Sequence, residues 1–112
     1  MEKNVVISIL YEYYGKLLTD KQAESIEMHY LEDLSLTEIA DIQGVSKQSI
    51  SETIKRSEKA LLDFEEGIGM YKRSNELGGL VDRLEKNLIN DLDDEEYSKY
   101  IDLIFQIKTK LK

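Results

Sequence analysis

The sequence contains no cysteine, no proline and no tryptophan in its 112 residues. Without cysteine, the chain has no disulfide, no thiolate zinc site and no cysteine nucleophile. Without proline, nothing in the sequence forces a helix to kink. All apolar runs are shorter than the roughly 18 to 20 residues of a membrane-spanning helix, and no small-residue cleavage site follows the apolar segment near the N-terminus. We therefore expect a cytoplasmic protein that is not inserted into a membrane.

Motifs for catalysis and metal binding are also missing. His29 is the only histidine and has no cysteine or second histidine to complete a metal site, so we expect a partly exposed helical position for it. The acidic run from Asp91 to Glu96 lacks the glycine that a calcium loop needs at its sixth position. No phosphate-binding glycine loop and no nucleophile elbow occurs. We expect no enzyme activity, no metal and no cofactor; Asp93 is instead expected to cap the last helix, whose dipole the acidic residues complement.

Charged residues are abundant, and acidic ones predominate. The chain is 41% hydrophobic and 34% charged, with a formal net charge of −8, which is typical of a soluble globular protein. Apolar residues recur at steps of three and four, so we predict an all-α fold: a helical bundle that contains a helix-turn-helix, with additional C-terminal helices. The predicted inward stripe of the first helix, which ends near Gly15, is Val6, Ile9, Leu10, Tyr13 and Leu17.

Two capping boxes mark the starts of the next two helices. Thr19 with Gln22, and Ser35 with Glu38, place two side chains three residues apart, where each satisfies the other's exposed backbone amide. The first of these helices should run from residue 20 to about residue 32. The residues expected to face inward on the two helices are Ala23, Ile26, Tyr30, Leu31, Leu36, Ile39, Ala40 and, at the margin, Ile42.

A helix-turn-helix is predicted over about residues 35–61. Gly44 should end its first helix, because glycine adopts positive φ, and Ser46 is placed to cap its second helix. The predicted packing face of that second helix is Ile50, Ile54, Ser57, Leu61 and Phe64. In such motifs the second helix enters the major groove of DNA, where polar side chains contact base edges. The candidate DNA-binding residues are Ser46, Lys47, Gln48, Ser51 and Lys55, with Arg56 and Lys59 holding phosphate.

The charge of this helix differs from that of the whole chain. Between Ser46 and Lys59, four basic residues and two acidic ones, Glu52 and Glu58, leave a local charge of +2. The two preceding helices are acidic and would repel phosphate. Since phosphate contacts supply much of the affinity for DNA, about four cations predict weak binding by a monomer, and dimerisation would double the contacts.

Five short segments between Leu18 and Leu61 match a known pattern: Leu18-Thr19, Tyr30 with Leu34, Glu38-Ile39-Ala40, Gly44-Val45-Ser46 and Lys59-Ala60-Leu61. On these residues the run resembles region four of bacterial sigma factors, whose helix-turn-helix recognises promoter DNA. Sigma recognition helices often present several arginines, whereas this chain has Ser49, Ser51 and Glu52 on the corresponding face. Taken whole, the chain resembles the YlxM-like family of small bacterial proteins. That resemblance implies a DNA-binding regulator and, through gene neighbourhood, a part in the signal recognition particle pathway.

The chain beyond the helix-turn-helix has its own helical pattern. Gly67 and Gly69 are expected to break or bend it, since glycine costs about 1 kcal/mol in a helix interior relative to alanine. We therefore predict an N-terminal helical part at residues 1–66 and a C-terminal helical hairpin at residues 67–112, together in one compact unit. The stripe of the fifth helix is Leu77, Leu80, Val81, Leu84 and Leu88.

The last helix is apolar on two sides. One stripe is Tyr97, Ile101, Ile104 and Leu111, the other is Tyr100, Leu103 and Ile107, and Phe105 lies between them. A single small core cannot easily bury both stripes. The pattern predicts a homodimer through the C-terminal helices, and the alternative is a groove for a partner's helix.

Two classes of function remain open. The first is a DNA-binding regulatory protein that inserts the helix after Ser46 into a major groove. The second is a protein- or ribonucleoprotein-binding adaptor of the signal recognition particle pathway, in which the same scaffold binds no DNA. The affinity of a DNA-binding protein for duplex DNA should fall steeply as the salt concentration rises, whereas an adaptor should not bind duplex DNA.

Overall fold

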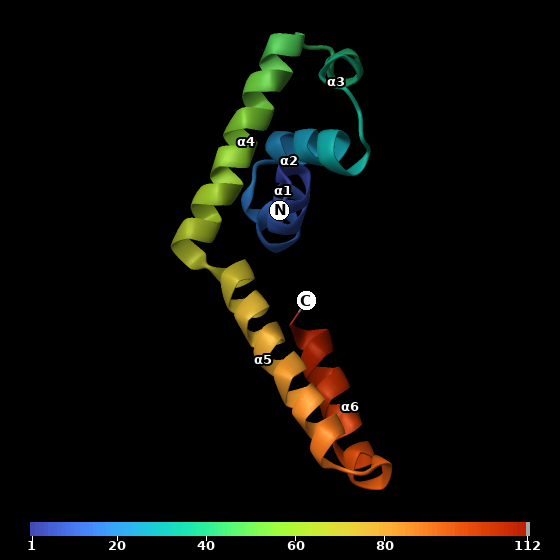
Figure 1. The fold of residues 1–112 in the computed structure, drawn as a ribbon. Coiled ribbons are helices and arrows are strands. Elements are labelled where there is room, and N and C mark those ends of the chain that lie inside the picture. Colours follow the sequence, from blue (N-terminus) through green and yellow to red (C-terminus); the bar gives the residue numbers. More distant parts are fainter. Residues whose placement is uncertain (112) are drawn as a thin grey trace. The chain divides into compact units, whose positions relative to one another are not determined.

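The computed structural model describes residues 1–111, and every regular element in that range is helical (Figure 1). The predicted all-α fold class is confirmed. The chain divides into two compact units, Met1–Tyr71 and a second unit that begins at Lys72. The elements are α1 (Lys3–Tyr14), η1 (Gly15–Leu17), α2 (Asp20–Ile26), η2 (Glu27–Leu31), α3 (Leu36–Gln43), α4 (Lys47–Ile68), α5 (Met70–Asp91) and α6 (Asp94–Lys110). None of the helices within residues 1–111 is long and apolar enough to span a membrane.

Reciprocal caps start α2 and α3. Thr19 Oγ1 accepts from the Gln22 amide at 3.2 Å, and Gln22 Oε1 accepts from the Thr19 amide at 3.1 Å. Ser35 and Glu38 make the same pair of hydrogen bonds, each at 3.1 Å. The hydrogen bonds from the Ser35 amide and side chain lower the pKa of Glu38. Both predicted capping boxes are confirmed, so the starts of these helices are fixed by local sequence.

The second helix ends at Leu31, close to the predicted end at about residue 32, but its geometry changes before that end. α2 stops at Ile26 and continues as the π-helix η2, in which the Glu32 amide donates to the Glu27 carbonyl at 2.9 Å. Because a π turn holds more residues than an α turn, the residues after Ile26 are rotated relative to a continuous α-helix. Tyr30 is half-buried, as expected, whereas Leu31, which was expected to face inward, is exposed.

Buried side chains form two clusters within the first unit. The first cluster, which joins α1 and α2 to α4, is Ile7, Leu10, Tyr14, Leu18, Ile26 and Leu61. The second cluster, which joins α3 to α4, is Ile39, Ala40, Ile50 and Ile54. The predicted packing face of α4 is confirmed, with Phe64 only half-buried, while Ile42 on α3 is exposed. Because α4 contributes to both clusters, α1, α2 and α3 are all held against this one helix.

The inward stripe of α1 agrees with the prediction at Leu10 and differs from it at its two ends. Ile7 and Tyr14 are buried in place of Val6 and Tyr13, which are half-buried. Both sets have helical spacing, and a helix with few polar residues does not show by periodicity which set faces the core. Leu17 was assigned to the same stripe but is exposed, because α1 has already ended and the 3-10 turn η1 follows.

α4 ends where Gly69 adopts a left-handed φ of 69°. The break expected near Gly67 and Gly69 therefore falls at Gly69, and Gly67 remains helical. Tyr14 ties this end of α4 to α1, because its hydroxyl donates to Glu65 Oε1 at 2.5 Å and accepts from the Met70 amide at 2.9 Å. Burial, and then the hydrogen bond to Glu65, raise the pKa of Tyr14.

The second unit is a two-helix hairpin with little interior. Asp93 caps α6 by accepting from an amide in its first turn at 2.8 Å, as predicted. Lys108 Nζ of α6 lies 2.7 Å from Glu85 Oε1 and 3.5 Å from Asp82 Oδ1 on α5. Among the described residues of this unit, 72–111, only Ile104 is buried. Most of the apolar surface that the sequence assigns to both helices is therefore uncovered in the hairpin.

Candidate nucleic-acid interface

A short turn joins α3 to α4. Gly44 closes α3 with a φ of 68°, and the Val45 amide donates to the Ala40 carbonyl at 3.1 Å. Ser46 Oγ then accepts from the Ser49 amide at 3.0 Å and caps α4. The second cluster packs the two helices together across this turn. The predicted helix-turn-helix is present, and the Ser46 hydroxyl is already engaged as a cap.

The first turns of α4 present the predicted polar residues to solvent. Lys47, Gln48 and Lys55 are exposed, and Ser51 is half-buried. Lys47, Ser51 and Lys55 are spaced by four residues, so they follow one another along one side of the helix with Gln48 beside them. These side chains offer hydrogen-bond donors from Lys47 and Lys55, and both donors and acceptors from Gln48 and Ser51.

The two residues predicted to hold phosphate lie further along α4. Arg56 is exposed. Lys59 is also exposed, but its Nζ lies 2.7 Å from Asp63 Oδ2, and this hydrogen bond raises the pKa of Lys59. An exposed ion pair of this kind is weak, yet a phosphate at Lys59 would have to displace Asp63. Lys59 is therefore less available for DNA than the other predicted cations.

Two shallow hollows flank α4 and bring in cations that the sequence did not indicate. In one, Lys21 of α2 lies with Ser49 and Arg56 of α4. In the other, Lys3 of α1 lies with Lys55 of α4. No pattern in the sequence placed Lys3 or Lys21 at the interface, because only the packing of α1 and α2 on α4 brings them there. Lys21 thus extends the cationic surface from α4 to α2, whereas Lys3 shares its hollow with Glu58.

Glu58 is buried, although it was included in the local charge of +2 that the sequence predicts for α4. Its relative exposure is 8%. Tyr30 donates its hydroxyl hydrogen to Glu58, and Lys3 Nζ lies 3.0 Å from Glu58 Oε2. Burial, and then the bond to Glu58, raise the pKa of Tyr30. Glu58 is thus paired with Tyr30 and Lys3. Between Lys47 and Glu58, the exposed acidic residue is Glu52.

Comparison with known proteins assigns the chain to a family. A family model described as "UPF0122: Putative helix-turn-helix protein, YlxM / p13 like" matches residues 1–104. The chain belongs to the UPF0122 family. The UPF0122 protein of Clostridium perfringens (strain SM101 / Type A) is 41% identical over 104 residues, which cover 91% of this chain and 92% of the relative. The resemblance to the YlxM-like family is therefore confirmed.

Two further UPF0122 relatives match over a shorter range. The protein of Thermoanaerobacter sp. (strain X514) is 44% identical over 82 residues, which cover 73% of this chain and 70% of the relative. The protein of Symbiobacterium thermophilum is 45% identical over 82 residues, which cover 73% of this chain and 77% of the relative. The family description agrees with the α3–turn–α4 geometry.

His29 has a structural environment within this UPF0122 fold. It lies half-buried in η2, where its Nδ1 is 2.9 Å from the Leu34 carbonyl oxygen. Its ring packs edge-on against Tyr30 with centroids 4.9 Å apart. Within residues 1–111, no group of three or more possible metal ligands comes together. His29 thus helps to hold the end of the π turn against the loop that follows it.

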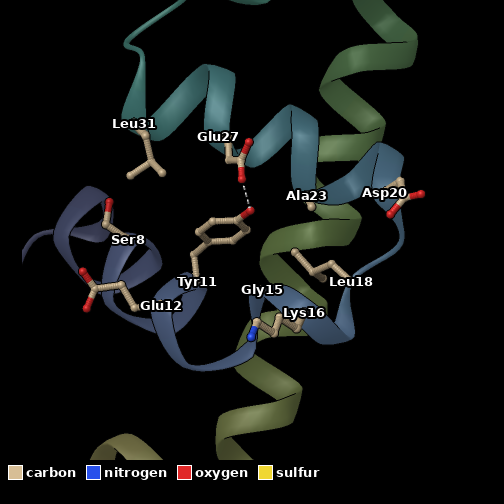
Figure 2. Close-up of a pocket in the computed structure, with 10 residues that line it drawn as sticks. All are labelled: Ser8, Tyr11, Glu12, Gly15, Lys16, Leu18, Asp20, Ala23, Glu27 and Leu31. Carbon is tan, nitrogen blue, oxygen red and sulfur yellow. Dashed lines mark hydrogen bonds between the residues drawn. The ribbon is translucent and has the colours of Figure 1, made fainter. Parts of the chain in front are cut away.

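A larger hollow of about 660 Å³ lies between α1 and the α2–η2 segment (Figure 2). Figure 2 shows the ring of Tyr11 extending from α1 towards Glu27, to which its hydroxyl donates a hydrogen bond. Burial, and then this hydrogen bond, raise the pKa of Tyr11 to about 12. The lining residues come from α1, η1, α2, η2 and the link at Leu18. The hollow is therefore separate from the polar face of α4.

The Gly15→Ala substitution is expected to destabilise the first unit by roughly 1–3 kcal/mol. A Cβ atom at Gly15 would lie 2.8 Å from Cε1 of the Tyr11 ring, so the ring, which donates its hydroxyl hydrogen to Glu27, would have to shift. Urea unfolding followed by far-UV circular dichroism measures the change.

Gly67→Ala is the matched control, because a Cβ atom at Gly67 meets nothing within 4 Å and Gly67 lies inside α4. That substitution should stabilise the protein by up to about 1 kcal/mol. Equal effects of the two substitutions would contradict the close packing of Gly15 against Tyr11.

Proposed function

We propose that this protein binds double-stranded DNA with α4 as the recognition helix and acts as a DNA-binding regulatory protein. The observation that carries the proposal is the exposure of Lys47 and Gln48 in the first turn of α4. This helix is the second helix of a helix-turn-helix whose two helices pack together through a buried cluster. The N-terminal residues of a recognition helix are those that contact base edges. Lysine and glutamine side chains make such contacts with guanine and adenine, respectively.

Cations beside α4 support contacts with phosphate. Lys21 next to Arg56, and Lys3 next to Lys55, lie on opposite flanks of the helix. A phosphate contact to each would anchor the protein while the first turn of α4 reads the groove. Lys3 is partly committed to Glu58, and Glu52 is exposed between the cations, so we expect weak binding by one copy. A homodimer held by the C-terminal helices would double the number of phosphate contacts.

Lys47→Glu combined with Lys55→Glu is expected to weaken duplex DNA binding by roughly tenfold or more at low salt. The slope of log affinity against log salt should also become shallower by about two, because two phosphates are no longer neutralised by a lysine. Fluorescence anisotropy with labelled genomic fragments, measured over a series of salt concentrations, gives both quantities.

The matched control is Lys16→Glu combined with Lys86→Glu, which changes the net charge equally at exposed lysines that are not part of α4. This control should bind much more tightly than the α4 variant. Glu52→Gln should instead increase the affinity, because it removes the exposed carboxylate from the face that meets phosphate.

Absence of duplex binding by the unmodified protein at low salt would overturn the proposal. That outcome would favour the alternative, an adaptor that binds a protein or ribonucleoprotein of the signal recognition particle pathway. The net charge of −8 favours this alternative, because an acidic protein is repelled by the phosphates of DNA.

A further inference from the structure

The second unit exposes far more apolar surface than it buries. Among its residues 72–111, only Ile104 is buried, while nine large apolar side chains are more than 40% exposed. A two-helix hairpin of this size does not bury enough apolar area to offset the chain entropy lost on ordering it. The hairpin therefore needs a covering surface.

Two stripes with the same spacing account for six of the exposed residues. Leu77, Leu80 and Leu84 lie at steps of three and four on α5, and Tyr100, Leu103 and Ile107 have the same steps on α6. All six are between 42% and 58% exposed. Residues at these steps share one side of a helix, so each stripe is continuous.

Both stripes lie on the same face of the hairpin. The sides of the helices that face each other carry half-buried Val81 and Leu88 on α5, and half-buried Tyr97 with buried Ile104 on α6. At 100° per residue, the exposed stripe is centred about 60° from the facing side on α5 and about 80° on α6, with the same sense of rotation. The two helices run antiparallel (Figure 1), so both rotations point to the same side of the hairpin. We call this surface the leucine face; its residues are Leu77, Leu80, Leu84, Tyr100, Leu103 and Ile107.

The opposite face is less suited to an apolar contact. It carries three exposed apolar residues, Ile89, Ile101 and Phe105. The ion pairs of Lys108 with Asp82 and Glu85 also lie on that side. The six residues of the leucine face, in contrast, expose roughly 500 Å² together, a large part of the roughly 800 Å² that each partner buries in a stable interface.

We propose that the leucine face is the interface of a symmetric homodimer in which two hairpins pack face to face and antiparallel. A two-fold axis that lies across the hairpin, in the plane of the contact, lays the α5 stripe of one copy on the partner's α5 stripe and the α6 stripe on the partner's α6 stripe. Each stripe then covers its own counterpart in reverse order, which is the self-complementarity that a two-fold interface requires.

The charged residues at the ends of the stripes favour a second copy of this chain as the partner of the leucine face. They also favour an antiparallel arrangement of the two copies. Arg73 lies one turn before Leu77, and Glu96 lies one turn before Tyr100; both charged side chains are exposed. Antiparallel pairing brings the partner's Glu96, at the turn end of the hairpin, to the end of the interface at which Arg73 lies. Parallel pairing would bring two acidic turns, each with five carboxylates between residues 91 and 96, next to each other.

This inference deepens the dimer part of the proposed function, since two copies present two α4 helices. Dimer formation can be measured without DNA. If the protein does not dimerise, DNA binding by α4 is still tested separately by the anisotropy assay.

Sedimentation of the full-length protein at micromolar concentrations is expected to show a dimer. Leu80→Glu combined with Leu103→Glu should raise the dimer dissociation constant by roughly 100-fold or more, because it places charges in the apolar interface. Ile89→Glu combined with Phe105→Glu is the control on the opposite face and should leave the dimer intact. Far-UV circular dichroism verifies that both variants keep their helices. A monomeric unmodified protein, or dissociation by the control as strong as by the first variant, would overturn the proposal.

A charge swap tests the antiparallel arrangement. Arg73→Glu should weaken the dimer, because it places a carboxylate near the partner's Glu96. Adding Glu96→Arg to the same chain should restore the dimer, because each copy then supplies both members of the reversed pair. If the double variant is as weak as Arg73→Glu alone, the antiparallel arrangement is wrong.

Discussion

The Leu61→Ala substitution is expected to lower the free energy of unfolding of the first unit by about 2–5 kcal/mol. Leu61 is fully buried on α4, in the cluster that holds α1 and α2 against this helix. Removing its isobutyl group leaves a cavity among Ile7, Leu10 and Ile26, which the packed backbone can fill only in part. The urea midpoint followed by far-UV circular dichroism should fall accordingly.

Leu62→Ala is the matched control for this loss. Leu62 is the next residue along α4, has the same chemistry and is 50% exposed. Its substitution should change the free energy of unfolding by no more than about 0.5 kcal/mol. Similar losses at the two positions would mean that α4 does not pack through the Leu61 face.

Raising the pH from 9 towards 12 is expected to destabilise the first unit strongly. Three tyrosines on α1 and η2 each donate a hydrogen bond to a carboxylate: Tyr11 to Glu27, Tyr14 to Glu65 and Tyr30 to Glu58. Burial and these carboxylates raise all three pKa values, that of Tyr11 to about 12. Their contribution to stability is complete below the unfolded pKa of about 10 and is lost as the pH rises through the folded pKa.

Urea midpoints measured at pH 8, 9, 10 and 11 would follow this loss. The unfolded chain releases its tyrosine protons from about pH 10 while the folded chain retains them, so stability falls with pH in this range. Tyr30→Phe should cost stability at pH 8, because it leaves Glu58 without this donor, but it should also flatten the decline above pH 10. An identical decline in Tyr30→Phe and the unmodified protein would contradict the coupling between Tyr30 and Glu58.

Helix starts could be predicted from the sequence because their causes lie within four residues. The pairs Thr19 with Gln22 and Ser35 with Glu38 form the hydrogen bonds that their spacing indicated. Ser46 accepts from the expected first turn of α4. The family resemblance rested on the same short segments, so it was accessible from the sequence as well.

The phase of α1 and the π geometry at the end of the second helix could not be predicted. On α1, neighbouring apolar residues offered two stripes of equal spacing, and contact with α2 and α4 selected Ile7 and Tyr14. The second helix ends with a π turn, and Leu31 at its end is exposed. The phase of α1 has no local signal, because it depends on packing against segments that are distant in the chain.

The sequence by itself determined the helical class, the caps, the turn at Gly44 and the side of α4 that packs, since capping, positive φ and periodicity are properties of short segments. Only the tertiary structure decided the electrostatics beside α4. It buried Glu58 against Tyr30 and Lys3, and it brought Lys21 alongside Arg56. The charge that a ligand meets depends on which groups are paired or buried, and this pairing joins residues that the sequence separates by more than twenty positions.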